Sequence, residues 1–181
     1  SDVYKRQDIC KDIGEETKRE KALEIYNKAL SYINPIIEYH NGFVDKYLPD
    51  GLMVLFDERA EDVIKCLLQI SLLVQRENIE RVLNGEDELL FSSGIHYGPL
   101  MIGTIGKEER MDGTVISDAV NIASRLNSYA LKQNIPIVIS QIVKDNFEDD
   151  INDCEAKFQY KGRVQLKGKI EAMEIYEVIR G

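Results

Sequence analysis

The stretch from residue 42 to residue 56 decides the fold of this chain, and it reads GFVDKYLPDGLMVLF. Two apolar runs, Phe43–Leu48 and Leu52–Phe56, flank the tripeptide Pro49-Asp50-Gly51. Proline presets a turn conformation, glycine tolerates the unusual dihedrals of turns, and aspartate bonds to nearby backbone. The stretch therefore predicts a β-hairpin with Asp50 at its turn.

Helical patterns lie on both sides of this hairpin. Upstream, apolar residues recur every three or four positions from Ala22 to Ile36, and Asn41-Gly42 ends the pattern. Pro35 lies inside it and is expected to bend or loosen the last turn without abolishing the helix. Downstream, the apolar residues Val63, Leu67, Ile70 and Val74 predict a second long helix that ends before Asn84-Gly85.

Strands dominate the second half of the chain. A second hairpin is expected around Gly98-Pro99, because this dipeptide favours a turn between two apolar runs. Another turn is expected at Lys167-Gly168-Lys169. The order of elements predicts an α+β fold with helices packed on a mainly antiparallel sheet. The predicted strands are Leu89–Tyr97, Leu100–Ile105, Ile135–Ile139, Phe158–Leu166 and Ala172–Ile179.

A third helix with two different faces is predicted after Ser117, which is expected to cap it. Asn121 and Arg125 are four residues apart, so they share one side of this helix and can reach one ligand. A guanidinium group offers planar donors that suit phosphate oxygens. Taken alone, the pair also fits an ordinary exposed helix surface. The apolar face carries Ala119, Ala123, Leu126 and Ala130, and the polar face carries Asn121, Arg125, Ser128 and Lys132.

The composition argues against some classes of binding partner and predicts the compartment. The 181 residues include 23 Lys and Arg against 32 Asp and Glu, which gives a net charge of −9. This charge argues against DNA, RNA or an anionic membrane surface as the main partner, because all three carry charge of the same sign. Three cysteines without close spacing and two histidines form no zinc or disulfide pattern, and they predict a reducing, cytoplasmic compartment.

Two charged side chains of the first hairpin each have two interpretations. Asp50 either holds a hard cation such as Mg²⁺ through its oxygens or simply favours the turn. Lys46 either faces a partner, since burying an unpaired ammonium is costly, or is a solvated lysine that protects an edge strand. Further along, the glycine-spaced run from Gly94 to Gly98 indicates a bulge or a close backbone approach to a ligand or partner. His96, within that run, is expected to be a packed strand residue rather than a catalytic base.

Two long motifs, taken together, resemble the class III nucleotidyl cyclases, which are adenylate and guanylate cyclases. They are GFVDKYLPDGLMVLF at 42–56 and GIHYGPLMIGTIGKEERMDGTVISDAVNIASRL at 94–126, and the resemblance extends from about Glu20 to Val178. It implies a ferredoxin-like βαββαβ core with an added C-terminal strand hairpin. It also implies head-to-tail homodimers, with two active sites at the interface that each take residues from both subunits.

The resemblance assigns metal and base contacts to three residues. Asp50 matches one of the two aspartates that bind metal, two Mg²⁺ or Mn²⁺ ions per site in the intact protein. Lys46 and Thr114 match the two positions that read the purine. Lysine at the first of these is similar to the adenine-selective members, whereas guanylate cyclases typically carry glutamate there.

The resemblance assigns ribose and phosphate contacts to four more residues. Asn121 matches the residue that orients the ribose. Arg125 matches the arginine that stabilises negative charge at the α-phosphate in the transition state. Lys167 most resembles the lysine that holds the terminal phosphates, and Lys169 is the next candidate.

These matches imply an adenylate cyclase that converts ATP to 3′,5′-cyclic AMP and pyrophosphate in intracellular signal transduction. The main alternative is a degenerate cyclase-like domain that dimerises or binds nucleotide to regulate an attached module. A guanylate cyclase is disfavoured by Lys46. Sensor, receiver or transmembrane segments often precede such domains, so the resemblance also allows a membrane-tethered parent protein.

The N-terminus departs from the family pattern. Residues 2–7 read DVYKRQ, which a widely used sequencing-library transposon end encodes when translated in frame, so residues 1–7 are expected to be non-native. The catalytic domain would then span residues 8–181 without its first strand, where the second metal aspartate belongs. With half a metal site, and with Pro49 in place of the usual glycine before Asp50, the 181-residue polypeptide is expected to be inactive or nearly so.

Overall fold

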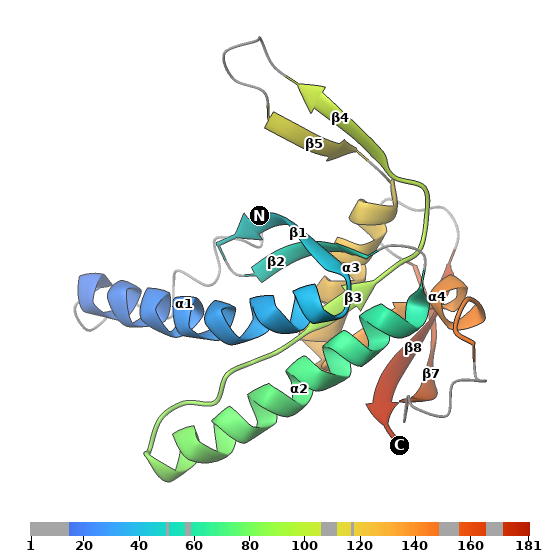
Figure 1. Cartoon of the computed structure of the whole chain (residues 1–181). Helices are drawn as coiled ribbons and strands as arrows, with labels where there is room; N and C mark the ends of the chain where they lie inside the picture. The colour runs from blue at the N-terminus through green and yellow to red at the C-terminus, as the bar shows by residue number, and fades with distance from the viewer. Residues whose placement is uncertain are drawn as a thin grey trace. The chain divides into compact units, whose positions relative to one another are not determined.

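The computed structural model describes residues 15–49, 51–56, 59–105, 112–116, 118–148, 156–165 and 172–181. The chain divides into two compact units, Ser1–Leu55 and Phe56–Gly181. Figure 1 shows the helices and strands of both units. In chain order they are α1 (Glu15–Tyr39), β1 (Gly42–Leu48), β2 (Gly51–Phe56), α2 (Ala60–Leu83), β3 (Ser93–Ile95), β4 (Met101–Ile105), β5 (Asp112–Ile116), α3 (Asp118–Gln133), β6 (Ile137–Ser140), α4 (Gln141–Asp145), β7 (Ala156–Val164) and β8 (Met173–Arg180).

The first unit consists of a long helix followed by a hairpin. Helix α1 continues through Pro35 to Tyr39, as the periodicity predicts. Asn41 then adopts a φ of 60°, a left-handed conformation that asparagine tolerates better than most residues, and the helix ends there. Strands β1 and β2 form a two-stranded sheet, which confirms the predicted hairpin, although Asp50 itself lies outside the described residues.

The second unit is built on a four-stranded sheet with the strand order β3-β6-β8-β7. Strands β3 and β6 run parallel, with Gly94 opposite Val138, whereas the β6–β8 and β7–β8 pairs are antiparallel. The register of β7 on β8 shifts between Tyr160 and Gly162, and Gly162 has a φ of 106° that favours glycine. The mainly antiparallel sheet and the C-terminal hairpin predicted from the sequence are thereby confirmed.

Strand β6 is buried on both of its faces. Ile137 and Ile139 pack against α2 and α4, whereas Val138 packs against α3. Because alternate residues of a strand point to opposite sides, α2 and α4 cover one face of the sheet and α3 covers the other. The helix residues in these two clusters are Ala60, Val63 and Ile64 of α2, Val143 of α4, and Ile122, Leu126 and Ala130 of α3.

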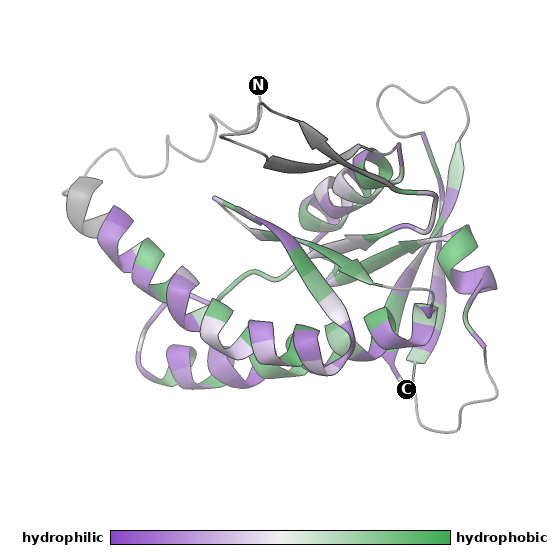
Figure 2. Cartoon of the chain, turned by 45° about the horizontal axis from the view of Figure 1, so that its top comes forward, coloured by the Kyte–Doolittle hydropathy of each residue, from purple (hydrophilic) through white to green (hydrophobic). Residues whose placement is uncertain are grey.

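The helices alternate hydrophobic and hydrophilic residues along their length (Figure 2). This pattern lets one side pack on a strand while the other meets solvent. Cys66 lies on the packed side of α2 with 1% of its surface exposed, and burial raises the pKa of its thiol to about 12. None of the helices that the structure describes is long and apolar enough to cross a membrane.

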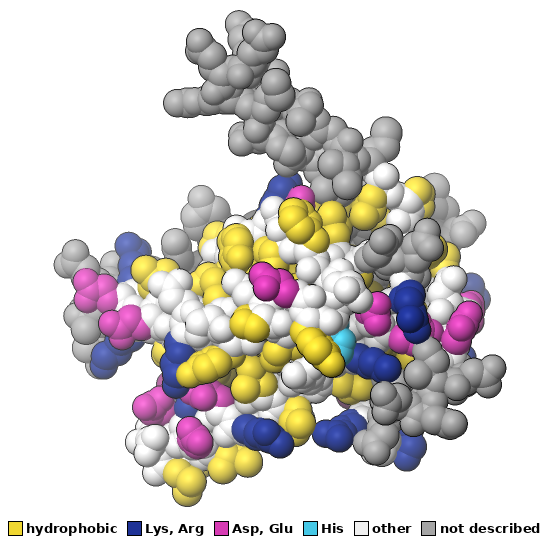
Figure 3. Space-filling view, viewed as in Figure 1, with side chains coloured by type: hydrophobic (Ala, Val, Ile, Leu, Met, Phe, Trp, Pro, Cys, Tyr) yellow, Lys and Arg dark blue, Asp and Glu magenta, His cyan; other side chains and the backbone are white. Residues whose placement is uncertain are grey.

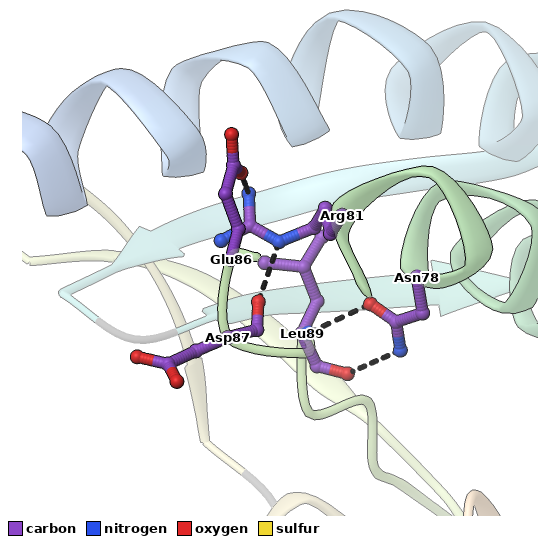
Figure 4. Close-up of polar contacts among 5 residues, drawn as sticks. All are labelled: Asn78, Arg81, Glu86, Asp87 and Leu89. Carbon is purple, nitrogen blue, oxygen red and sulfur yellow. Dashed lines mark hydrogen bonds and ion pairs between the residues drawn. The ribbon is translucent and has the colours of Figure 1, made fainter. Parts of the chain in front are cut away.

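Polar side chains at the end of α2 hold the connection to β3 (Figure 4). The Asn78 side chain donates to the carbonyl oxygen of Leu89 at 3.0 Å and accepts from the Leu89 N–H at 2.7 Å. The Arg81 guanidinium donates to the carbonyl oxygen of Asp87 at 2.6 Å and pairs with the Glu86 carboxylate at 3.0 Å. These contacts give hydrogen-bond partners to backbone groups that lie outside helices and strands. They thereby hold the segment that connects α2 to β3.

The predicted second hairpin around Gly98-Pro99 is wrong. Strand β3 pairs with β6 rather than with the strand that follows it, and β4 pairs with β5 in a separate two-stranded sheet. The dipeptide Gly98-Pro99 is typical of turns, but parallel pairing joins segments that are far apart in sequence. Turn residues do not indicate such pairing. Strand β5 begins Asp112-Gly113, which reads as a turn, and neither β5 nor the short helix α4 was expected from the sequence.

Substitution of Leu126 by alanine tests the packing of α3. Leu126 is fully buried, so Leu126→Ala is expected to lower the free energy of unfolding by about 3 kcal/mol, because it leaves a cavity in the core. Urea denaturation followed by circular dichroism measures this change. Leu131 lies on the same helix with 37% of its surface exposed, and Leu131→Ala is expected to cost less than about 1 kcal/mol. Equal losses at both positions would contradict the described packing.

Candidate nucleotide-binding site

The seven predicted site residues are distributed over both units. Lys46 lies in β1 of the first unit. In the second unit, Thr114 lies in β5, and Asn121 and Arg125 lie in α3. The remaining three predicted residues, Asp50, Lys167 and Lys169, lie outside the described residues.

Lys46 lies on the face of β1 that points away from α1. Its neighbour Tyr47 accepts a hydrogen bond from the Asn34 side chain of α1, with 3.2 Å between the two atoms. Because successive strand residues point to opposite sides, the Lys46 side chain projects from the other face of the hairpin. The ammonium group, which carries three donors and no acceptor, is therefore presented away from the helix that supports the strand.

Tyr26 of α1 contacts the end of β1 and the start of β2. Its hydroxyl oxygen is 2.8 Å from the carbonyl oxygen of Leu48 and 2.9 Å from that of Gly51. The single hydroxyl proton is shared between these two acceptors, which flank Pro49 and Asp50 on either side. The periodicity of α1 placed Tyr26 on its apolar side, but the sequence offers no signal that its hydroxyl would bond to this turn.

Asn121 and Arg125 lie on the side of α3 opposite its packed side. Asn121 is exposed and Arg125 is half-buried, whereas Ile122 and Leu126, each the next residue along the helix, are buried. In the described part of the chain, no hydrogen bond or ion pair holds that guanidinium or the Asn121 amide. Their donors are thus available to a ligand, and a phosphate or a ribose hydroxyl suits them.

Thr114 belongs to the segment that leads into this helix. It lies opposite Gly103 in the antiparallel β4–β5 pair, and β5 ends two residues before α3 begins. Thr114 is therefore close in sequence to the helix that carries Asn121 and Arg125.

The glycine-spaced run from Gly94 to Gly98 approaches α3 closely. The sequence of this run indicates a bulge or a close backbone approach to a ligand or partner. In the structure, the run instead lies close to a helix of the same unit. Between the two glycines, His96 is partly buried, and its Nδ1 lies 2.8 Å from the buried Ser140 hydroxyl. This contact fits the expectation that His96 is a packed residue.

A metal site requires several oxygen ligands close together. Among the residues that the structure describes, no three His, Cys, Asp or Glu side chains are grouped closely enough to hold an ion. Mg²⁺ is usually bound through one or two carboxylates together with substrate phosphates and water, so a complete protein cage is not required. The expected metal ligand Asp50 fits this requirement by its chemistry and lies outside the described residues.

Residues 11–180 match the family described as the adenylate and guanylate cyclase catalytic domain. The chain therefore belongs to this family. An adenylate cyclase of Anabaena cylindrica is 35% identical over 163 residues, which cover 84% of this chain and 31% of that protein. Adenylate cyclase 1 of Rhizobium meliloti (strain 1021) is 24% identical over 173 residues, which cover 92% of this chain and 25% of that protein. The chain thus spans less than a third of the length of these relatives.

Solved structures with the same fold support the family assignment. A bacterial light-regulated adenylyl cyclase matches with a TM-score of 0.73 at 25% identity, over 88% of this chain and 45% of that chain. The guanylyl cyclase Cya2 matches with a TM-score of 0.72 at 24% identity, over 88% and 80% of the two chains. The adenylyl cyclase CyaB from P. aeruginosa matches with a TM-score of 0.71 at 24% identity, over 90% of this chain and 84% of that chain. The class III cyclase fold predicted from the sequence is confirmed.

Removal of the Tyr26 hydroxyl tests the contact with the turn. Tyr26→Phe is expected to lower the free energy of unfolding by about 1 kcal/mol, because two carbonyl oxygens lose their shared donor. Tyr32→Phe on the same helix removes a hydroxyl from a residue that is 48% exposed, and a change below about 0.5 kcal/mol is expected. Urea denaturation measures both changes. A Tyr26→Phe chain as stable as Tyr32→Phe would show that the turn does not depend on this bond.

Proposed function

We propose that this chain is the catalytic domain of an adenylate cyclase, which converts ATP to 3′,5′-cyclic AMP and pyrophosphate in intracellular signalling. The observation that carries the proposal is the pair Asn121 and Arg125, presented together with available donors on one side of α3 in a chain of this family. The adenylate cyclases among its relatives support the choice of reaction.

The proposed reaction needs positive charge near the α-phosphate. Attack of the ribose 3′-oxygen on the α-phosphorus increases the negative charge on the phosphoryl oxygens. Arg125 would donate to those oxygens, and a cation already held in place stabilises the transition state without reorganisation. Asn121, one helical turn earlier, would bond to the ribose and orient the 3′-oxygen toward the phosphorus. In phosphoryl transfer such an arginine contributes about 10³ or more in rate.

Lys46 and Thr114 would select adenine. The lysine ammonium donates hydrogen bonds only, so it suits the N1 acceptor on the Watson–Crick edge of adenine. Guanine carries an N–H at that position, which a carboxylate would accept. Lys46 projects away from α1 on a strand that α1 supports, which leaves its ammonium available to a base.

The metal ions and the terminal phosphates would be held at the chain's turns. We propose that Asp50 contributes a carboxylate to Mg²⁺ or Mn²⁺, and that Lys167, with Lys169 as the next candidate, holds the terminal phosphates. A bound metal would lower the pKa of the 3′-hydroxyl and offset phosphate charge.

A second copy of the chain is the proposed partner. The β4–β5 hairpin forms a two-stranded sheet of its own. An isolated two-stranded hairpin is only marginally stable in water, so contact with another chain would stabilise it. Large hydrophobic side chains are also exposed elsewhere, such as Phe43 at 66% and Leu83 at 81%, and hydrophobic side chains gather in patches on the face in Figure 3. We propose a head-to-tail homodimer with nucleotide sites that both subunits complete.

Exchange of Lys46 for glutamate tests the base assignment through binding alone. Lys46→Glu is expected to weaken ATP binding at least tenfold and to remove the preference for ATP over GTP, because the carboxylate repels the adenine N1 lone pair. Isothermal titration with each nucleotide measures this. Lys21→Glu makes the same charge change at an exposed position of α1 and is expected to leave the preference unchanged. An unaltered preference in Lys46→Glu would show that Lys46 does not read the base.

Removal of Arg125 tests the reaction itself. Arg125→Ala is expected to lower kcat for cyclic AMP formation by about 10³ while KM for ATP changes less than threefold, because the contact forms mainly in the transition state. Cyclic AMP is quantified with Mg²⁺-ATP, in the chain alone and in the chain extended by its native upstream sequence. Arg76→Ala removes the same group from an exposed position of α2 and serves as the control.

The same assay separates the two functions considered from the sequence. Cyclic AMP formation that depends on Arg125 supports the enzyme. ATP binding without any cyclic AMP, in both forms of the chain, would instead indicate a nucleotide-binding regulatory domain. Weaker ATP binding with unchanged turnover in Arg125→Ala would contradict the assigned role of the arginine.

A further inference from the structure

Helix α3 contacts the chain at and after β3 with no room for a side chain at two glycines. A Cβ atom on Gly94 would overlap the backbone nitrogen of Asn127 and the carbonyl oxygen of Ala123, and it would lie 2.7 Å from the carbonyl carbon of Leu126. A Cβ atom on Gly98 would lie 2.9 Å from the Cβ atom of Ala119. Both distances are too short for carbon atoms that are not bonded to each other.

Three other glycines in the described part of the chain have open space around them. At Gly51, Gly85 and Gly162, an added Cβ atom would meet nothing within 4 Å. Gly98 meets the first turn of α3, and Gly94 meets its middle turns, so the two contacts fix the helix at two points along its axis. Asn121 and Arg125 lie between these points on the opposite side of the helix.

The glycine-containing segment is joined to strand β6 and to the residue that precedes it. Strand β3 pairs with β6, and the Ser93 N–H donates to the carbonyl oxygen of Pro136 at 2.8 Å. Just before Gly98, His96 contacts the buried hydroxyl of Ser140 at 2.8 Å. A larger residue at position 98 would therefore increase the separation between this segment and the first turn of α3.

We propose that Gly94 and Gly98 are positioning residues, which set the distance of α3 from the sheet and so place Asn121 and Arg125 for the nucleotide. The proposal rests on the function proposed for these two side chains. The glycines touch no substrate atom in this role and act through the helix backbone alone. A displacement of about 1 Å in a group that contacts a reacting phosphate is enough to lower turnover about 10²-fold.

A pair of substitutions tests the contact at Gly98. Gly98→Ala adds one methyl group against the Ala119 side chain, and Ala119→Gly removes the methyl group that it meets. The double variant therefore restores the space, whereas Gly98→Ala alone displaces the helix. Gly94→Ala overlaps backbone atoms that no side-chain change relieves, so the Gly98 pair gives the clearer test.

Two measurements are made on the whole chain for the parent, Gly98→Ala, Ala119→Gly and the double variant. The Asn121 side-chain amide and the Arg125 Nε–H signals in ¹H–¹⁵N spectra report where the two side chains lie. Gly98→Ala is expected to shift both signals and the double variant to return them. Steady-state kinetics, measured in the form of the chain that produces cyclic AMP, are expected to show kcat at least tenfold lower in Gly98→Ala with KM within threefold, and recovery to within twofold of the parent in the double variant.

Gly85→Ala provides the control for a general loss of stability. Gly85 has a φ of 73°, so alanine there strains the turn after α2, yet its Cβ atom enters open space. Gly85→Ala is expected to lower the melting temperature without moving the Asn121 and Arg125 signals and without changing kcat. A merely structural role of Gly98 would give the same result as Gly85→Ala.

The outcomes separate this inference from the proposed function. Unshifted signals in Gly98→Ala, or shifted signals that the double variant does not restore, would overturn the positioning role. So would shifted signals with unchanged kcat. If the parent chain and its natively extended form produce no cyclic AMP, the proposed reaction fails, while the spectra still decide whether these glycines place the two side chains.

Discussion

The burial of β6 on both of its faces is the constraint on which the second unit depends. All four of its residues, Ile137–Ser140, are buried, and successive side chains point to opposite sides. A strand of this kind requires a helix on each face, and α2 with α4 supplies one while α3 supplies the other. Helix α3 is therefore part of the core and not an attachment to its surface, so its position is set by packing against Val138 and Ile175. Core packing at near-crystalline density leaves such a helix little freedom to shift.

The same helix connects the core to the candidate site. Its packed side lies so close to β3 that only a glycine fits at position 94, and its other side presents Asn121 and Arg125. A side chain that must meet a phosphate at a defined place is best carried by an element that cannot move, because an ordered donor pays no cost of reorganisation when charge develops. The packing of α3 thus fixes one side of the helix and leaves Asn121 and Arg125 on its other side.

The first unit follows a similar principle with different contacts. There the hairpin of β1 and β2 is held from α1 by two polar side chains, since Asn34 donates to Tyr47 and Tyr26 donates to the carbonyl oxygens on either side of the turn. These bonds orient β1 so that Lys46 projects from the side away from the helix. In each unit, the residues proposed to bind nucleotide lie on an element whose opposite side is packed or hydrogen-bonded. In the first unit this element is β1, and in the second it is α3. The exposed hydrophobic side chains leave surface that a second chain could cover.

The sequence by itself determined the elements whose signals are local. Periodicity defined α1 through Pro35, α2 and the two faces of α3, the Pro49-Asp50-Gly51 turn defined the first hairpin, and two motifs defined the family and the candidate site residues. The tertiary structure alone decided that β3 pairs with β6, that β4 pairs with β5, and that the partner of Gly94 and Gly98 is α3. The spacing of these glycines indicated a bulge or a close backbone approach to a ligand or partner, and did not indicate helix α3. The physical reason is distance along the chain. Residues 94 and 138, or 98 and 119, become neighbours only when the core forms around β6. A short sequence pattern does not show which distant residues it will contact.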